Sequence, residues 1–172
     1  HGSVLPAADY KVTRKLENGK GVYSFCMCPG GYVVNASSEE EMLAVNGMSY
    51  HSRAGRNANS AMVVTVGPED FGSDAILAGM EFQRKLERAA FQAGEGKIPV
   101  QLFGDFLKDQ KSQALGEVEP QNKGQWQFGD VRGIFPERLA ASLAEGISSC
   151  EHLIPGFSRP DAILSGVESR TS

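Results

Sequence analysis

The spacing of hydrophobic and polar residues divides the chain into two parts. Up to about residue 67, short apolar runs are separated by turn residues such as Gly, Asn and Asp, a pattern typical of β-strands. These runs predict strands at 10–16, 22–27, 32–36, 42–46 and 61–66. Short connections between strands favour an antiparallel sheet, which can curl toward a barrel.

From Ser73 onward the hydrophobic period becomes helical. Apolar residues three and four positions apart predict a helix over 74–93, which Ser73 or Asp74 can cap. A second helix is predicted from Pro136, because proline is favoured in a first turn; its apolar side consists of Leu139, Leu143, Ile147 and Cys150. The remaining patterns predict an extended segment at 99–103, a short helix within 106–114, a turn-rich stretch over 117–130 and a last strand at 162–164.

These elements predict an α+β fold in which an antiparallel β-sheet packs with two longer helices. A length of 172 residues with 41% hydrophobic content is enough for one ordinary core. We therefore expect a single domain over 1–172 that is β-rich at about 8–67, helix-rich at about 73–156 and closed by a returning strand at about 160–168.

The least ordinary stretch is 24–31, which holds two of the three cysteines, a proline and a glycine pair. The apolar runs on either side predict that Cys28-Pro29-Gly30-Gly31 is a tight connection between two antiparallel strands. If 24–28 is extended, Cys26 and Cys28 project from the same face. Two thiols on one surface are candidates for redox or nucleophilic chemistry. The alternative is a strand edge with two small residues, and a disulfide between them is disfavoured by their separation.

The polar stretch 47–60 is a second candidate site, because loops of this length often carry function. It contains a histidine, two arginines and several amide and hydroxyl side chains. Arginine offers a planar fork of donors, which suits an anionic substrate or a cofactor phosphate. His51, Arg53 and Asn59 are the strongest candidates, and a solvated loop with asparagine turns is the alternative.

Three motifs in order, 23–31, 46–49 and 57–61, make the chain resemble the middle region of bacterial FAD-dependent dehydrogenases, a largely uncharacterised flavoprotein family. The resemblance extends from about residue 8 to residue 172. It implies a substrate or cap domain, inserted into a FAD-dependent oxidoreductase, that closes over the flavin and shapes the substrate site. The partners it implies are the missing flavin-binding domain of the same chain and a small-molecule substrate.

The resemblance also implies roles for individual residues. The implied catalytic residues are Cys26, Cys28, His51 and Arg53; the implied substrate-binding residues are Asn46, Met48, Asn57 and Asn59; and the implied cofactor-binding residues are Arg170, Thr171 and Ser172. A glycine-rich fingerprint for the FAD pyrophosphate does not occur in the sequence. We therefore expect this fragment alone to be inactive and to hold no FAD, although the full-length protein would bind it.

Composition disfavours several other classes of function. A net charge of −4 and a pI near 5.4 argue against an electrostatic nucleic-acid or membrane-surface binder, and no apolar run is long enough to span a membrane. Three cysteines do not make a secreted disulfide framework, so we expect a cytoplasmic protein. Two alternatives stay open: a non-catalytic binding module, and a small zinc domain that uses Cys26, Cys28, Cys150 and either His51 or His152.

Overall fold

The computed structural model describes residues 11–169. Within that range the strands are β1 (Thr13–Lys15), β2 (Gly21–Cys28), β3 (Gly31–Asn35), β4 (Val45–Ser49), β5 (Asn59–Val64), β6 (Ile98–Leu102), β7 (Asn122–Lys123), β8 (Trp126–Phe128) and β9 (Ile163–Ser165). The α-helices are α1 (Pro68–Phe71), α2 (Ala78–Ala93), α3 (Phe103–Leu107) and α4 (Glu137–Ser149). Two 3-10 turns, η1 (Arg132–Ile134) and η2 (Cys150–His152), flank α4.

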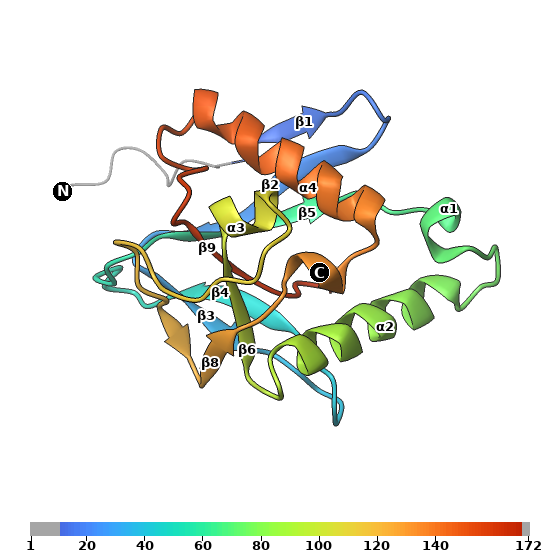
Figure 1. Ribbon diagram of the computed structural model, residues 1–172, viewed down its shortest axis with the longest axis horizontal. Helices are drawn as coiled ribbons and strands as arrows, with labels where there is room; N and C mark the ends of the chain where they lie inside the picture. Colours follow the sequence, from blue (N-terminus) through green and yellow to red (C-terminus); the bar gives the residue numbers. More distant parts are fainter. Residues whose placement is uncertain (1–10, 170–172) are drawn as a thin grey trace.

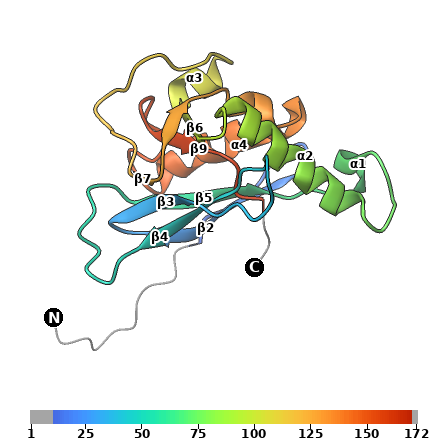
Figure 2. The same ribbon diagram turned by 90° about the horizontal axis from the view of Figure 1, so that it is seen from below.

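The strands form three small sheets, ordered β1-β2-β5, β4-β3-β7 and β8-β6-β9. Most pairs are antiparallel, whereas β3 with β7 and β6 with β8 are parallel. Strands β2 to β5 lie in one layer, and α2, α3 and α4 all lie on one side of it (Figures 1 and 2). The predicted α+β class with antiparallel sheets and two longer helices is confirmed. None of the sheets in residues 11–169 closes into a barrel.

The core lies between the strand layer and the helices. The predicted apolar side of α4 is confirmed, since its four residues from Leu139 to Cys150 are all buried. Close packing of α4 on β2 depends on Gly146, where a Cβ atom would lie 2.4 Å from a methyl carbon of Val22. On α2, Leu86 is buried in the same core and Phe82 packs against it. Burial of these stripes is the main driving force for the fold.

Several predicted boundaries are wrong. The helix expected at 74 begins at Ala78, because the Ser73 hydroxyl accepts the Ala75 N–H in a local turn instead of capping a helix. The strand expected at 42–46 lies at Val45–Ser49, and the short helix expected within 106–114 lies at Phe103–Leu107. The turn-rich stretch contains β7 and β8, whose parallel partners are distant in sequence and leave no local signal.

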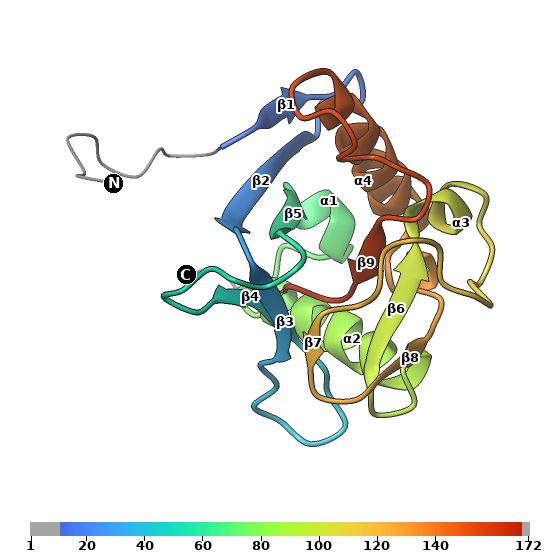
Figure 3. The ribbon, with the colours of Figure 1, turned by 90° about the vertical axis from the view of Figure 1, so that its left-hand side faces the viewer.

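The connection at Cys28-Pro29-Gly30-Gly31 is not a hairpin. Its two strands belong to different sheets, since β2 pairs with β1 and β5 while β3 pairs with β4 and β7. Figure 3 shows β2 passing into β3 along one edge of the molecule with a change of direction between them. The proline and glycine pair therefore make a corner that carries the chain from one sheet into the next.

Candidate functional site

The end of β2 is irregular at the two cysteines. Strand pairing runs from Phe25 opposite Ala61 to Cys28 opposite Asn59, so β2 has one residue more than β5 over this interval. The extra residue is accommodated by a left-handed backbone at Cys26, with φ of 49°. Residues 24–28 are therefore not extended throughout. Strand alternation thus no longer supports the prediction that Cys26 and Cys28 share a face.

The two thiols have different surroundings. Cys26 is exposed, whereas Cys28 is half-buried and its Sγ donates a hydrogen bond of 3.4 Å to the Cys26 carbonyl. Burial raises the pKa of Cys28, a hydrogen bond with Ser49 lowers it, and the neighbouring Cys26 raises it; the net shift is upward. Cys28 is thus a protonated thiol at neutral pH, suited to donating a hydrogen bond or a proton rather than to acting as a thiolate.

We expect Cys26 to be alkylated several-fold faster than Cys28 in the folded protein. The reason is that Cys26 is exposed while burial raises the pKa of Cys28, and iodoacetamide reacts with the thiolate. Burial also raises the pKa of Cys150, which should react last. Peptide mass spectrometry over a time course at pH 7.5 measures the three rates. Equal rates for Cys26 and Cys28 would contradict the difference in surroundings.

Asn59 enters a space left by two glycines. A Cβ atom on Gly31 would lie 2.5 Å from Asn59 Nδ2, and one on Gly47 would lie 2.3 Å from Asn59 Oδ1. The same position on Gly47 is 3.7 Å from Cys28 Sγ. Ser49 completes the group, because its hydroxyl donates to the Pro29 carbonyl at 2.8 Å. We name Cys28, Gly31, Gly47, Ser49 and Asn59 the glycine corner.

The glycine corner contains an unused hydrogen-bond donor. Asn59 Nδ2 is buried and has no hydrogen-bond partner in residues 11–169. Leaving a buried amide N–H unpaired costs about 1–3 kcal/mol unless a water, an ion or a ligand satisfies it. Gln121 Nε2, which packs against Gly55, is unpaired in the same way.

Gln121 holds the loop beside the corner, and sequence reasoning missed it. Its Oε1 accepts the backbone N–H groups of Arg56 and Asn57 at 3.0 and 3.1 Å. The Asn57 amide donates to the Glu119 carbonyl at 2.8 Å, and the Asn57 carbonyl accepts the Gly31 N–H at 2.8 Å. Gln121 stands 64 positions after Asn57, so no local pattern could have indicated that it anchors this loop.

The structure separates the other predicted site residues. Asn46 and Met48 alternate with Val45, which lies in the core, and so project from the opposite face of β4 to Gly47 and Ser49. His51 is exposed in the loop, and Arg53 is exposed with its carbonyl oxygen against Gly30. Arg170, Thr171 and Ser172 lie outside the described residues. Of the predicted residues, the structure thus brings together Cys28, Asn57 and Asn59.

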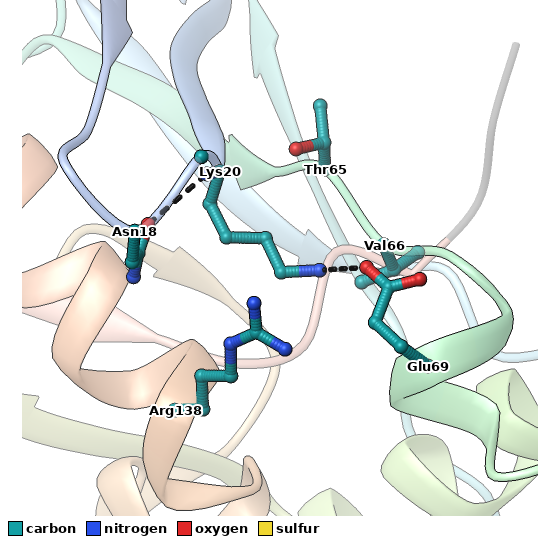
Figure 4. A pocket seen from close by; sticks show the side chains of 7 residues that line it. Asn18, Lys20, Thr65, Val66, Glu69 and Arg138 are labelled. Atoms are coloured by element: carbon teal, nitrogen blue, oxygen red, sulfur yellow. Dashed lines mark hydrogen bonds and ion pairs between the residues drawn. The ribbon is translucent and has the colours of Figure 1, made fainter.

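A small pocket of about 170 Å³ lies away from this corner, between the 16–21 turn, α1 and α4. Figure 4 shows Lys20 reaching Glu69 across it, with Arg138 of α4 beneath. Lys20 Nζ is 2.7 Å from Glu69 Oε1 and also binds the carboxylate of Asp70. Because these partners occupy the lysine, its role is to fasten α1 to the β1–β2 turn.

The alternative of a zinc domain is not supported by the side chains within residues 11–169. No group of three or more His, Cys, Asp and Glu side chains in that range is placed to hold a metal ion. Cys150 is buried at the end of α4, where its Sγ donates to the Gly146 carbonyl. It therefore does not form a second ligand pair with His152 in the arrangement that a structural zinc site requires.

These observations define an α+β domain with a thiol, a hydroxyl and an unpaired amide gathered where two sheets meet. The family model described as "FAD-dependent protein, C-terminal domain-like" matches residues 1–171. The chain therefore belongs to that family and is a domain of a FAD-dependent protein. The inserted, middle position implied by the sequence motifs stays a prediction.

A relative in Clostridium beijerinckii is 54% identical over 171 residues and is described only as an uncharacterized protein. The match covers 98% of this chain and 32% of the relative, so the chain spans about a third of the relative's length. None of the helices in the described range is long and apolar enough to cross a membrane.

The described residues fit one part of FAD. The flavin ring has a carbonyl edge that accepts hydrogen bonds, and the unpaired Nδ2 of Asn59 and Nε2 of Gln121 are donors of the matching type. The pyrophosphate is usually held at the start of a long helix after a glycine-rich turn. In residues 11–169, strands lead directly into helices only at α1 and α3, which have four and five residues. The described residues therefore offer donors of the type that the ring accepts and show no cradle for the pyrophosphate.

Proposed function

We propose that this chain is the domain of a FAD-dependent oxidoreductase that closes over the flavin ring and shapes the substrate site. The observation that carries the proposal is the unpaired, buried Nδ2 of Asn59 beside the half-buried thiol of Cys28. A polar group in this position is costly unless a bound molecule satisfies it. A flavin carbonyl or a polar substrate is a suitable acceptor, and the match to a FAD-dependent family favours the flavin.

In this proposal the flavin supplies the electron transfer when it is bound, and the chain supplies position and polarity. Asn59 donates a hydrogen bond, and Cys28, whose pKa is raised by burial, stays protonated and can turn its S–H from the Cys26 carbonyl to the bound acceptor. The exposed His51 and Arg53 lie on the loop next to the corner, where they would meet an anionic substrate as it enters. Closure by this domain would also exclude water from the reacting atoms.

The test uses the full-length protein that contains this chain. We expect it to be yellow with stoichiometric flavin, and we expect Asn59→Ala to shift the flavin midpoint potential. A lost hydrogen bond to a charged acceptor costs about 1.5–3 kcal/mol, and 1.4 kcal/mol corresponds to about 30 mV for two electrons, so the shift should be about 30–60 mV. Cys28→Ala should shift the potential in the same direction. Spectroelectrochemical titration measures both.

The matched control removes an amide elsewhere. Gln92 is exposed on α2, and Gln92→Ala should leave the potential unchanged. If Asn59→Ala and Cys28→Ala behave like Gln92→Ala, the glycine corner does not face the flavin and the proposal is wrong. A full-length protein without flavin would instead favour a non-catalytic binding module.

A further inference from the structure

The strand layer has one face that the described helices leave uncovered. In Figures 2 and 3, strands β2 to β4 border the molecule on the side away from α2, α3 and α4. An antiparallel sheet with one solvated face normally carries polar residues on that face. The residue types on this face therefore indicate whether it is exposed to solvent or packs against another protein surface.

Alternation along the strands identifies which residues point outward. On β2, Val22 lies in the core and Ser24 is buried, so Tyr23 and Phe25 project from the other face. On β5, Met62 and Val64 pack against the core, which turns Ala61 and Val63 outward. Pairing places Tyr23 opposite Val63 and Phe25 opposite Ala61, so these four form one continuous apolar group.

The neighbouring strands extend the same pattern. Val33 and Val45 pack on the core, so Tyr32 and Val34 of β3 and Met48 of β4 project outward. Tyr32 is opposite Met48 in the strand pairing. We name this set the outer face: Tyr23, Phe25, Tyr32, Val34, Met48, Ala61 and Val63. Polar residues at other outward positions flank this set: Asn46 on β4, Thr13 and Lys15 of β1 opposite Tyr23 and Gly21, and Lys123 of β7 opposite Val34.

The outer face resembles the centre of a protein interface more than a solvated sheet. Aromatic and methionine side chains are enriched at interface centres, while charged residues are moved to the rim. Here Phe25 is 40% exposed in spite of its size. Two lysines lie over its rings: Lys11 Nζ is 4.8 Å from the Tyr23 ring centre, and Lys123 Nζ is 4.5 Å from that of Tyr32.

We propose that the outer face packs against the remainder of the same polypeptide in the full-length protein. The occupant is inferred from length: the relative that matches 98% of this chain is about three times as long, since the match covers 32% of it. The inference rests on the proposed function in one respect, because that function makes the remainder the part that carries the flavin. Docking through the outer face would place the exposed Cys26 and the 50–58 loop at the edge of the same contact. The glycine corner, whose Gly47 and Ser49 lie on the opposite face of β4, would be reached around that edge.

Hydroxyl-radical footprinting of the full-length protein tests this docking. Oxidation rates of Phe25, Tyr32 and Met48 are compared with those in the denatured protein, and Leu153, which is 58% exposed, serves as the reference. Relative to its rate in the denatured protein, we expect Phe25, which is 40% exposed in this domain, to be labelled several-fold more slowly than Leu153. Leu153 should stay reactive.

Two further measurements separate the occupants. Protection should not change on dilution of a protein that light scattering shows to be monomeric; protection that disappears on dilution would mean that a second copy covers the face, and the inference would be overturned. Phe25→Asp should restore labelling of Tyr32 and Met48, whereas Leu153→Asp, the same change on an exposed leucine, should not. If Phe25→Asp fails to fold, the wild-type footprint still shows whether the outer face is covered.

Flavin content, read by absorbance on the same samples, distinguishes the two proposals. Protection in a protein without flavin would support docking and sink the proposed function. A yellow protein in which Phe25 and Met48 oxidise as fast as an exposed side chain would keep the proposed function and overturn the docking face.

Discussion

Lys20→Met should lower the free energy of unfolding by about 3–5 kcal/mol, the usual loss when one partner of a buried ion pair is removed. The side chains of Lys20 and Asp70 are only 5% and 4% exposed. Without the lysine, the Asp70 carboxylate stays buried with the Gly67 N–H as its remaining donor, at 2.9 Å. Glu69 is 53% exposed and should contribute little to the loss.

Chemical denaturation at pH 7 measures the loss, and Lys15→Met is the matched control. Lys15 is exposed on β1, so removal of its charge should change stability by less than about 0.5 kcal/mol. A double variant, Lys20→Met with Asp70→Leu, should recover part of the lost stability because no buried charge is left unpaired. If Lys20→Met matched Lys15→Met, the buried pair would have no role in fastening α1.

The pH dependence of this loss follows from the two pKa shifts. Burial lowers the pKa of Lys20, but hydrogen bonds and charges from Asp70 and Glu69 outweigh it and raise the pKa above its ordinary 10.5. The Lys20 contribution is therefore fully present below 10.5 and is lost as the pH rises through the folded pKa. The hydrogen bond from Lys20 lowers the pKa of Glu69 below 4.5, so its contribution is lost as the pH falls through that folded pKa. The difference in free energy of unfolding between wild type and Lys20→Met should therefore become smaller at pH values below the folded pKa of Glu69 and above that of Lys20.

Gly30→Ala should destabilise the fold by about 2–5 kcal/mol through two separate effects. Gly30 has a left-handed backbone with φ of 58°, which costs an alanine about 1–2 kcal/mol. In addition, its Cβ would lie 2.2 Å from the Arg53 carbonyl oxygen, so the 50–58 loop or the corner must move. Relief of such overpacking costs about 1–3 kcal/mol more.

Gly19→Ala separates these two effects. Gly19 also has a positive φ, of 81°, but nothing lies within 4 Å of its Cβ position. Gly19→Ala should therefore lose only the backbone cost, about 1–2 kcal/mol in the free energy of unfolding. The additional loss in Gly30→Ala then measures the contact between the corner and the loop. Thermal and denaturant unfolding of both variants gives the numbers. Equal losses would show that the loop does not press on the corner.

Local pattern was sufficient for the elements that bury one apolar stripe. The stripe on α4 and much of that on α2 are confirmed because a helix places residues three and four apart on one face whatever surrounds it. The early strands were predicted for the same reason, since alternation and turn residues are local properties. Their ends were less certain, as the shift from 42–46 to Val45–Ser49 shows, because hydrogen-bonded partners decide where a strand ends.

The candidate site depended on contacts between residues far apart in sequence. The sequence singled out the cysteines and the glycine pair, and it placed Asn57 and Asn59 in the neighbouring loop. It could not show the bulge at Cys26, because an extra residue is defined only against the partner strand β5. It could not show that Gly31 and Gly47 make room for Asn59, because they come from β3 and β4.

Local sequence pattern was thus enough to predict the α+β class, the helix faces and an unusual thiol and glycine motif. Long-range contacts make this motif a corner between sheets, make Gln121 the anchor of its loop and bury Lys20 against α1. The difference lies in the range of the interactions. Periodicity and turn chemistry act over a few residues, whereas the pairing of strands and of buried polar groups joins positions 40 to 70 residues apart, as Lys20 with Asp70 and Asn57 with Gln121 show.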